Sequence, residues 1–144
     1  MASFSHSVEI PRPPAEVFPW LLEADKVPKW TGHLERYEQV DGAPLGRGSK
    51  VRQVLDMSGR TIDVTLEVTG YEPPSGAQTR FSTNGIEVVN SYALEASGAG
   101  TRLTQSVEAK PSGLTARMLV PVVQPRLEQK LTEDLERLRE TLTG

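Results

Sequence analysis

Apolar residues are distributed differently before and after about residue 113. Before it, apolar and polar residues alternate in short runs separated by turn residues, which is the pattern of half-buried strands. After it, leucines recur at helical spacing, at Leu127, Leu131, Leu135, Leu138 and Leu142. The pattern therefore predicts a sheet followed by one long terminal helix over 113–142.

The alternating part predicts seven strands. The first covers 4–10 and the second 34–40, where Tyr37 falls out of phase and indicates a bulge. The other five lie between residues 51 and 109. The turn sequences between these strands include 41–48, Ser58-Gly59 and Asn84-Gly85. Strands joined by hairpins in this way form an antiparallel sheet.

Two short helical segments are expected between the first two strands. Apolar residues on one side of 15–22 predict a helix, which Pro19 should distort because proline removes a backbone donor. Asp25 is a candidate N-cap for a further turn at 27–30. A single α+β domain over 1–144, with one curved antiparallel sheet wrapped round the terminal helix, satisfies the whole pattern.

The terminal helix is expected to have two different halves. Its first half, 114–123, has almost no polar face, and Pro121 should bend it. We expect Met118 and Val122 in this half to line the mouth of a cavity and to move as a lid. In the second half the leucine stripe should pack on inward strand residues such as Val64, Leu66 and Leu103. The charged residues between the leucines, including Lys130 and Asp134, indicate a solvated back.

Composition argues against several classes of function. The net charge is −3 with scattered Lys and Arg residues, which gives no reason to bind nucleic acid. No apolar run reaches the length of a membrane span. Cysteine is absent and His6 is far from His33, so neither a metal site nor a cofactor is expected. The lack of cysteine suits a cytoplasmic protein, and we expect a monomer or weak homodimer.

Five segments, in order along the chain, resemble one known family: 8–18 (VEIPRPPAEVF), 27–30 (VPKW), 42–48 (GAPLGRG), 68–74 (VTGYEPP) and 100–104 (GTRLT). They resemble the START-like, helix-grip (SRPBCC) superfamily, in its bacterial polyketide cyclase/dehydrase and lipid-transport branch. The resemblance implies a helix-grip fold in which a gap between sheet and helix holds a hydrophobic ligand. Some members of that superfamily cyclise poly-β-ketone chains, some carry lipids, and some bind a chaperone ATPase.

Several polar residues fall on the inward phase of their strands: His6, Gln53, Thr83, Asn90, Tyr92 and Gln105. An unpartnered buried polar group costs about 1–3 kcal/mol. These residues therefore either satisfy one another, as Asn90 and Gln105 could on neighbouring strands, or face a wet cavity that accepts a ligand. The candidate ligand contacts among the inward strand residues are Gln53, Phe81, Asn90, Tyr92 and Gln105.

The resemblance implies two further contacts, because Trp30 and Tyr37 match positions where the cyclases place pocket aromatics. Core packing is the alternative for both. The cyclases also place an arginine in the pocket from a central strand. Here apolar residues hold that face, and Arg52 and Arg80 fall on the outward phase. No carboxylate in the sequence is expected to orient His6 as a base.

Three functions follow, in order of preference. The first is binding of a small hydrophobic ligand, such as a lipid or polyketide, between the sheet and the terminal helix. The second is a polyketide cyclase or dehydratase that uses the same cavity. The third is a chaperone-activator type of interaction module. The third needs an exposed apolar or strongly charged surface, which the outward strand positions do not show.

Overall fold

The computed structural model describes residues 2–40, 42, 44–57 and 59–143. Asp41, Ala43 and Ser58, which the sequence assigns to turns, lie outside these ranges. The strands are β1 (Ala2–Ile10), β2 (Leu34–Gln39), β3 (Lys50–Met57), β4 (Arg60–Glu72), β5 (Gly76–Thr83), β6 (Ile86–Ser97) and β7 (Gly100–Pro111). The helices are α1 (Pro14–Val17), the 3-10 turns η1 (Phe18–Trp20) and η2 (Val27–Lys29), and α2 (Leu114–Thr143).

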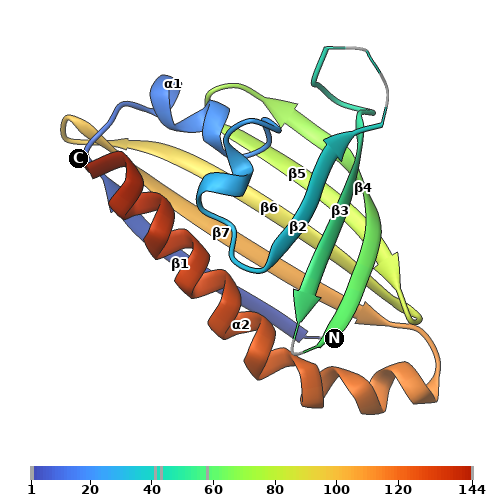
Figure 1. Cartoon of the computed structure of the whole chain (residues 1–144). Helices are drawn as coiled ribbons and strands as arrows, with labels where there is room; N and C mark the ends of the chain where they lie inside the picture. Colours follow the sequence, from blue (N-terminus) through green and yellow to red (C-terminus); the bar gives the residue numbers. More distant parts are fainter. Residues whose placement is uncertain (1, 41, 43, 58, 144) are drawn as a thin grey trace.

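The strands form one antiparallel sheet in the order β1-β7-β6-β5-β4-β3-β2 (Figure 1), in which the hairpin pattern predicts the order from β2 to β7. The hairpin at Asn84-Gly85 has positive φ at both residues, 51° and 76°, which is the turn that matches the twist of paired strands. The predicted bulge in β2 is present, with a register shift between Leu34 and Arg36. A second register shift lies between Val68 and Gly70 of β4, and bulges of this kind increase the local bend of a strand.

The segment between β1 and β2 follows the sequence pattern except at its cap. The expected helix at 15–22 is divided into α1 and η1 next to Pro19. The expected N-cap Asp25 is wrong, because Lys26 precedes η2 and no side chain caps it. The carbonyl of Glu23 already accepts the N–H groups of Lys26 and Val27, at 3.0 Å each, so the turn needs no carboxylate there.

The helix α2 runs along β1, while β2, β3 and β4 curve away on the other side (Figure 1). Leu135, Leu138 and Leu142 are buried in the main core together with Leu103 of β7. Leu127 and Leu131 are half-buried over a second cluster, which contains Ile86, Val88 and Val107. Val64 and Leu66, which we expected under the helix, instead form a third cluster with Val51, because α2 does not reach β3 and β4.

The helix α2 stays continuous through Pro121 and Pro125 but changes direction in its first half (Figure 1). A proline nitrogen cannot donate to the carbonyl one turn back, which explains the bend. In this half Ala116 and Val120 are buried against the second cluster.

Candidate functional site

A cavity of about 120 Å³ lies between the concave face of the sheet, the segment before β2 and α2. Most of its lining is apolar: Leu21, Leu22, Val27, Trp30, Leu55, Leu66, Phe81, Val88, Val107, Leu127 and Leu131. An apolar cavity of about 150 Å³ engineered into another protein takes up benzene. The cavity is therefore large enough for one ring or a short alkyl segment.

All but two of the predicted contacts line this cavity: Trp30, Tyr37, Gln53, Phe81, Asn90, Tyr92 and Gln105. They come from the segment before β2 and from β2, β3, β5, β6 and β7, whose inward phase places them on one face. The prediction for Met118 and Val122 is wrong, because their exposed fractions are 67% and 69% and neither lines the cavity. Ala116 and Val120 take the inward face, and the first residue of α2 at the cavity is Leu127. This half of α2 is therefore not placed as a lid.

The polar residues on β6 and β7 satisfy one another and also line the cavity. Gln105 Nε2 donates to Asn90 Oδ1 at 2.9 Å and lies 3.5 Å from the Tyr92 hydroxyl. Burial raises the pKa of Tyr92 to about 12, so its hydroxyl stays protonated near neutral pH. The two alternatives for these residues, mutual pairing and a cavity, therefore both describe part of what is found. His6 and Thr83, also predicted to face inward, are not among the lining residues.

Of the two aromatic residues carried over from the resemblance, Trp30 makes a hydrogen bond within the segment before β2, and Tyr37 joins that segment to β2. Trp30 Nε1 donates to the Trp20 carbonyl at 2.8 Å, and the Tyr37 hydroxyl donates to the Leu22 carbonyl at 2.9 Å. Burial raises the pKa of Tyr37 as well. Core packing and cavity lining are thus combined in the same two side chains.

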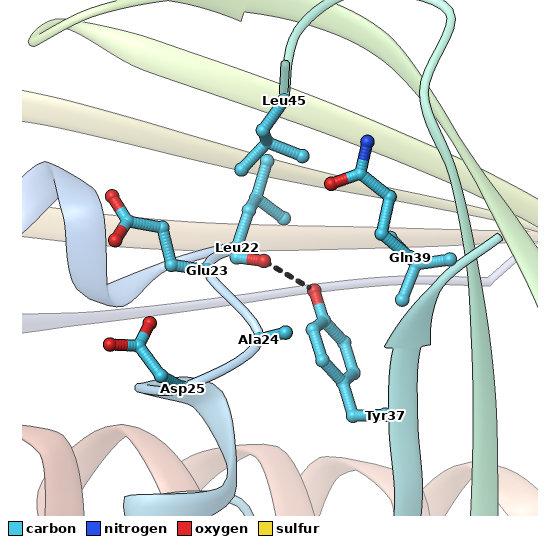
Figure 2. Close-up of a pocket in the computed structure, with 8 residues that line it drawn as sticks. Leu22, Glu23, Ala24, Asp25, Tyr37, Gln39 and Leu45 are labelled. Carbon is cyan, nitrogen blue, oxygen red and sulfur yellow. Dashed lines mark hydrogen bonds between the residues drawn. The ribbon is translucent and has the colours of Figure 1, made fainter. Parts of the chain in front are cut away.

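A second hollow of about 320 Å³ lies on the outer side of Tyr37, lined by Leu22, Glu23, Ala24, Asp25, Tyr37, Gln39, Leu45 and Val51. Figure 2 shows the Tyr37 hydroxyl bonded to the Leu22 carbonyl, with the carboxylates of Glu23 and Asp25 pointing away from Tyr37. Leu22 and Tyr37 line both hollows. Their hydrogen bond therefore lies in the wall between the inner cavity and this outer recess.

Two charged residues that the sequence assigned to a solvated back are buried at the cavity. Lys130 and Asp134 are 8% and 4% exposed, and both line it. The Lys130 ammonium donates to Asp134 Oδ2. Asp134 Oδ1 accepts from the Gly32 amide at 2.9 Å and from Arg137 Nη1 at 3.0 Å. The expectation of a solvated face is wrong for this pair.

A signal for this pair was available in the sequence. Asp134 lies three residues after Leu131 and four before Leu138, which is the spacing of the apolar stripe itself. Lys130 lies four residues before Asp134 and three after Leu127. Helical spacing alone therefore places both on the flank of the buried face.

His6 does have a carboxylate partner, contrary to expectation. Its Nε2 lies 3.1 Å from Glu136 Oε2, which α2 brings across β1. A hydrogen bond from Arg139 and then the one from His6 lower the pKa of Glu136. The pair is partly exposed and lines neither hollow, so it joins α2 to β1 without reaching the cavity.

The remaining charged and polar candidates are placed as expected. Arg52 pairs with Asp63 at 2.7 Å and Arg80 with Glu67 at 3.0 Å, all on the outer face of the sheet. Within the described residues, no group of three or more His, Cys, Asp or Glu side chains is arranged to hold a metal ion. In the same part of the chain, no helix is long and apolar enough to cross a membrane.

Solved structures with this fold come from several sources. Ara h 8.0201 is 20% identical, with a TM-score of 0.79 over 98% of this chain and 97% of that one. TTHA0849 from Thermus thermophilus is 17% identical, with a TM-score of 0.80 over 98% and 97% of the two chains. The di-domain ARO/CYC StfQ from the steffimycin biosynthetic pathway is 12% identical, with a TM-score of 0.79 over 98% of this chain and 50% of StfQ. At these identities the likeness shows the fold.

No curated protein matches the sequence. A sequence model of one family does match it, over residues 1–143, and that family is described as polyketide cyclase/dehydrase and lipid transport. With nearly the whole chain matched, the protein belongs to the polyketide cyclase/dehydrase and lipid transport family.

Proposed function

We propose that the protein binds a small hydrophobic ligand in the cavity between the sheet and α2. The observation that carries this proposal is the cavity itself, about 120 Å³ of space with a mainly apolar lining. Protein interiors hold few voids larger than a water molecule. Burying an apolar group against this lining would contribute about 25 cal/mol per Å² of apolar area removed from water.

The polar groups in the lining support the same proposal. Ligand pockets are mainly apolar, with a small number of converging polar groups that orient the ligand. Here Gln105, Asn90 and Tyr92 lie together on β6 and β7, opposite Lys130 of α2. A ligand with one polar end and an apolar body suits this arrangement.

The size of the two hollows favours an elongated ligand. The inner cavity holds only a ring or a short chain, while the outer recess of about 320 Å³ lies behind the shared wall of Leu22 and Tyr37. Movement of Tyr37 away from the Leu22 carbonyl would join them. A lipid or polyketide chain could then extend from one into the other.

The proposal can be tested by filling the cavity. Val88 lines it, whereas the next residue, Val89, belongs to the opposite face of β6. Val88→Phe should weaken binding of the neutral probe toluene, measured by isothermal titration calorimetry, by at least about tenfold, and Val89→Phe should leave binding unchanged. Thermal melting of both variants checks that they fold. Equal probe binding by the two variants would contradict the proposed site.

Native mass spectrometry of protein purified from its own host complements this test, because a co-purified molecule would identify the ligand. Its mass would also decide between a ligand confined to the inner cavity and one that spans both hollows.

An enzyme of the cyclase or dehydratase type is a second candidate, favoured by one observation. Lys130 brings a cation to the cavity from the helix, where the strands supply none. A cation beside a carbonyl oxygen polarises it, and the Tyr92 hydroxyl is a proton donor in the same cavity. Formation of a cyclised or dehydrated product from a poly-β-ketone thioester, lost in Lys130→Met, would favour this candidate over simple binding.

A further inference from the structure

The Lys130 ammonium is the feature of the cavity that ligand binding alone does not explain. Lysine is rarely buried to this degree, because removing its charge from water is costly without a compensating partner. Its partner is Asp134. That carboxylate, however, is also bound by Arg137, at 3.0 Å. Two cations therefore share one carboxylate, which leaves one positive charge uncompensated in the group.

The two cations lie differently with respect to the cavity. Arg137 is 44% exposed and also donates to the Trp30 carbonyl at 3.0 Å, so it neutralises Asp134 from the solvent side. Lys130 is 8% exposed and lines the cavity. The uncompensated positive charge therefore acts inside the cavity, through Lys130. The low dielectric there strengthens its attraction for an anion.

The ammonium also has unused hydrogen-bonding capacity. It carries three N–H donors, of which the contact with Asp134 uses one. No further acceptor for it is found among the residues that the structure describes. The other side chains at the cavity wall are uncharged, apart from Asp134. Burial holds the pKa of Tyr92 far above neutrality, so this hydroxyl adds a donor and no negative charge.

We infer that the end of the ligand that enters the cavity is a carboxylate, bound by Lys130 Nζ with the help of the polar groups on β6 and β7. This inference rests on the proposed function and names the class of ligand: a hydrophobic monocarboxylic acid. One uncompensated positive charge matches one carboxylate. A phosphate monoester carries about −1.5 to −2 near neutral pH and would leave negative charge buried.

A matched pair of ligands tests this inference on the unaltered protein. Octanoate and 1-octanol have the same chain length and differ in the head group. Isothermal titration calorimetry at pH 7 gives the affinity of each. The wild-type protein should bind octanoate roughly tenfold more tightly than 1-octanol, which is the size expected for hydrogen bonds to a charged group.

The variant Lys130→Met removes the charge and keeps an unbranched side chain that is one atom shorter. It should lose that preference, with octanoate about tenfold weaker and 1-octanol changed by less than about threefold. Asp134 keeps Arg137 and the Gly32 amide in this variant, so the fold should persist. Lys110→Met is the matched control, because Lys110 is an exposed lysine paired on the outer surface. It should behave as wild type.

The outcomes separate this inference from the proposed function. Equal affinity of the wild-type protein for octanoate and 1-octanol overturns the carboxylate and leaves ligand binding intact. So does a preference for octanoate that survives in Lys130→Met. If the neutral probe and both octyl compounds fail to bind at all, ligand binding in the cavity is itself wrong.

Discussion

Asp134 connects two parts of the chain, α2 and the loop before β2, through one carboxylate with three donors. It accepts from Lys130 and Arg137 on its own helix and from the Gly32 amide in the loop before β2. A buried carboxylate with three donors holds that loop against α2 at the wall of the cavity. Removing either partner of a buried pair is costly mainly because the other charge is left alone.

The two members of this pair should therefore differ in their effect on stability. Asp134→Leu leaves the buried Lys130 without its counter-charge and should lower the free energy of unfolding by about 3–5 kcal/mol. Lys130→Met should lower it by much less, because Asp134 retains two donors. Urea denaturation of both variants measures the difference. Equal losses would mean that the carboxylate is not shared as described.

Tyr92 allows the contribution of a single hydroxyl to binding to be measured. Tyr92→Phe keeps the ring and removes one donor, worth about 0.5–1.5 kcal/mol when neutral. Octanoate should bind roughly two- to tenfold more weakly, while the melting temperature changes little because the Gln105–Asn90 bond remains. Tyr71→Phe is the control, since Tyr71 packs on Phe18 and does not line the cavity. Unchanged octanoate affinity in Tyr92→Phe would remove Tyr92 from the site.

The pattern of residue types along the chain predicts the strand residues of this site but not the helix residues. Strand alternation has only two phases, so the inward positions of Asn90, Tyr92 and Gln105 followed directly from it. A helix offers more directions, and a charged residue at its flank is normally solvated. Lys130 and Asp134 were therefore assigned to solvent, although their spacing to the leucines placed them beside the buried face.

At the scale of elements, the first half of α2 shows where the pattern contains too little information. Met118, Leu119, Val120 and Val122 are all apolar, so no phase distinguishes the face that packs from the face that does not. The bend at the prolines and the position of Ile86 and Val88 decide it, and these are tertiary facts. The second half, with polar residues between its leucines, was predicted correctly for Leu135, Leu138 and Leu142.

The assignment of faces in this half can be tested with two neighbouring valines. Val120 is 6% exposed and Val122 is 69% exposed. Val120→Ala should lower the free energy of unfolding by about 1–3 kcal/mol, the range for removing two buried methyl groups and leaving a small cavity. Val122→Ala should change it by less than about 0.5 kcal/mol. The reverse order in urea denaturation would show that α2 is rotated relative to this description.

The contact between His6 of β1 and Glu136 of α2 should make the free energy of unfolding vary with pH in the acid range. The bonds from Arg139 and His6 lower the pKa of Glu136 from its ordinary 4.5. A carboxylate of this kind stabilises the fold above its ordinary pKa, and the effect disappears as the pH falls through the lowered value. Glu136→Gln should lower the free energy of unfolding at neutral pH, by less than about 1 kcal/mol because the pair is partly exposed.

Near pH 2 the carboxyl is protonated in the wild-type protein, so the two proteins should then be equally stable. Urea denaturation at both pH values checks this, with Glu140→Gln, an exposed change on the same helix, as the control. A deficit of the same size at both pH values would show that titration of Glu136 is not its cause.

At the scale of the whole molecule, the hairpins between β2 and β7 could be predicted because each is set by local turns and alternation. The pairing of β1 with β7 could not, since no local signal connects strands so far apart. The cavity, likewise, could be predicted only in part. Inward polar residues indicated it, but its volume depends on how far α2 stands from β3 and β4.

The pairing of the first strand with the last also determines how the chain can fold. Residues such as Phe4 and Val107, or Val8 and Leu103, must meet across nearly the whole sequence. Native contacts of such long separation slow folding, because loop-closure entropy is lost before the contacts form. That entropy grows only with the logarithm of loop length, so the closure adds little to the thermodynamic cost. Until β1 docks, β7 is an open edge that can pair with another chain, and the rate of that one closure sets how long the risk lasts.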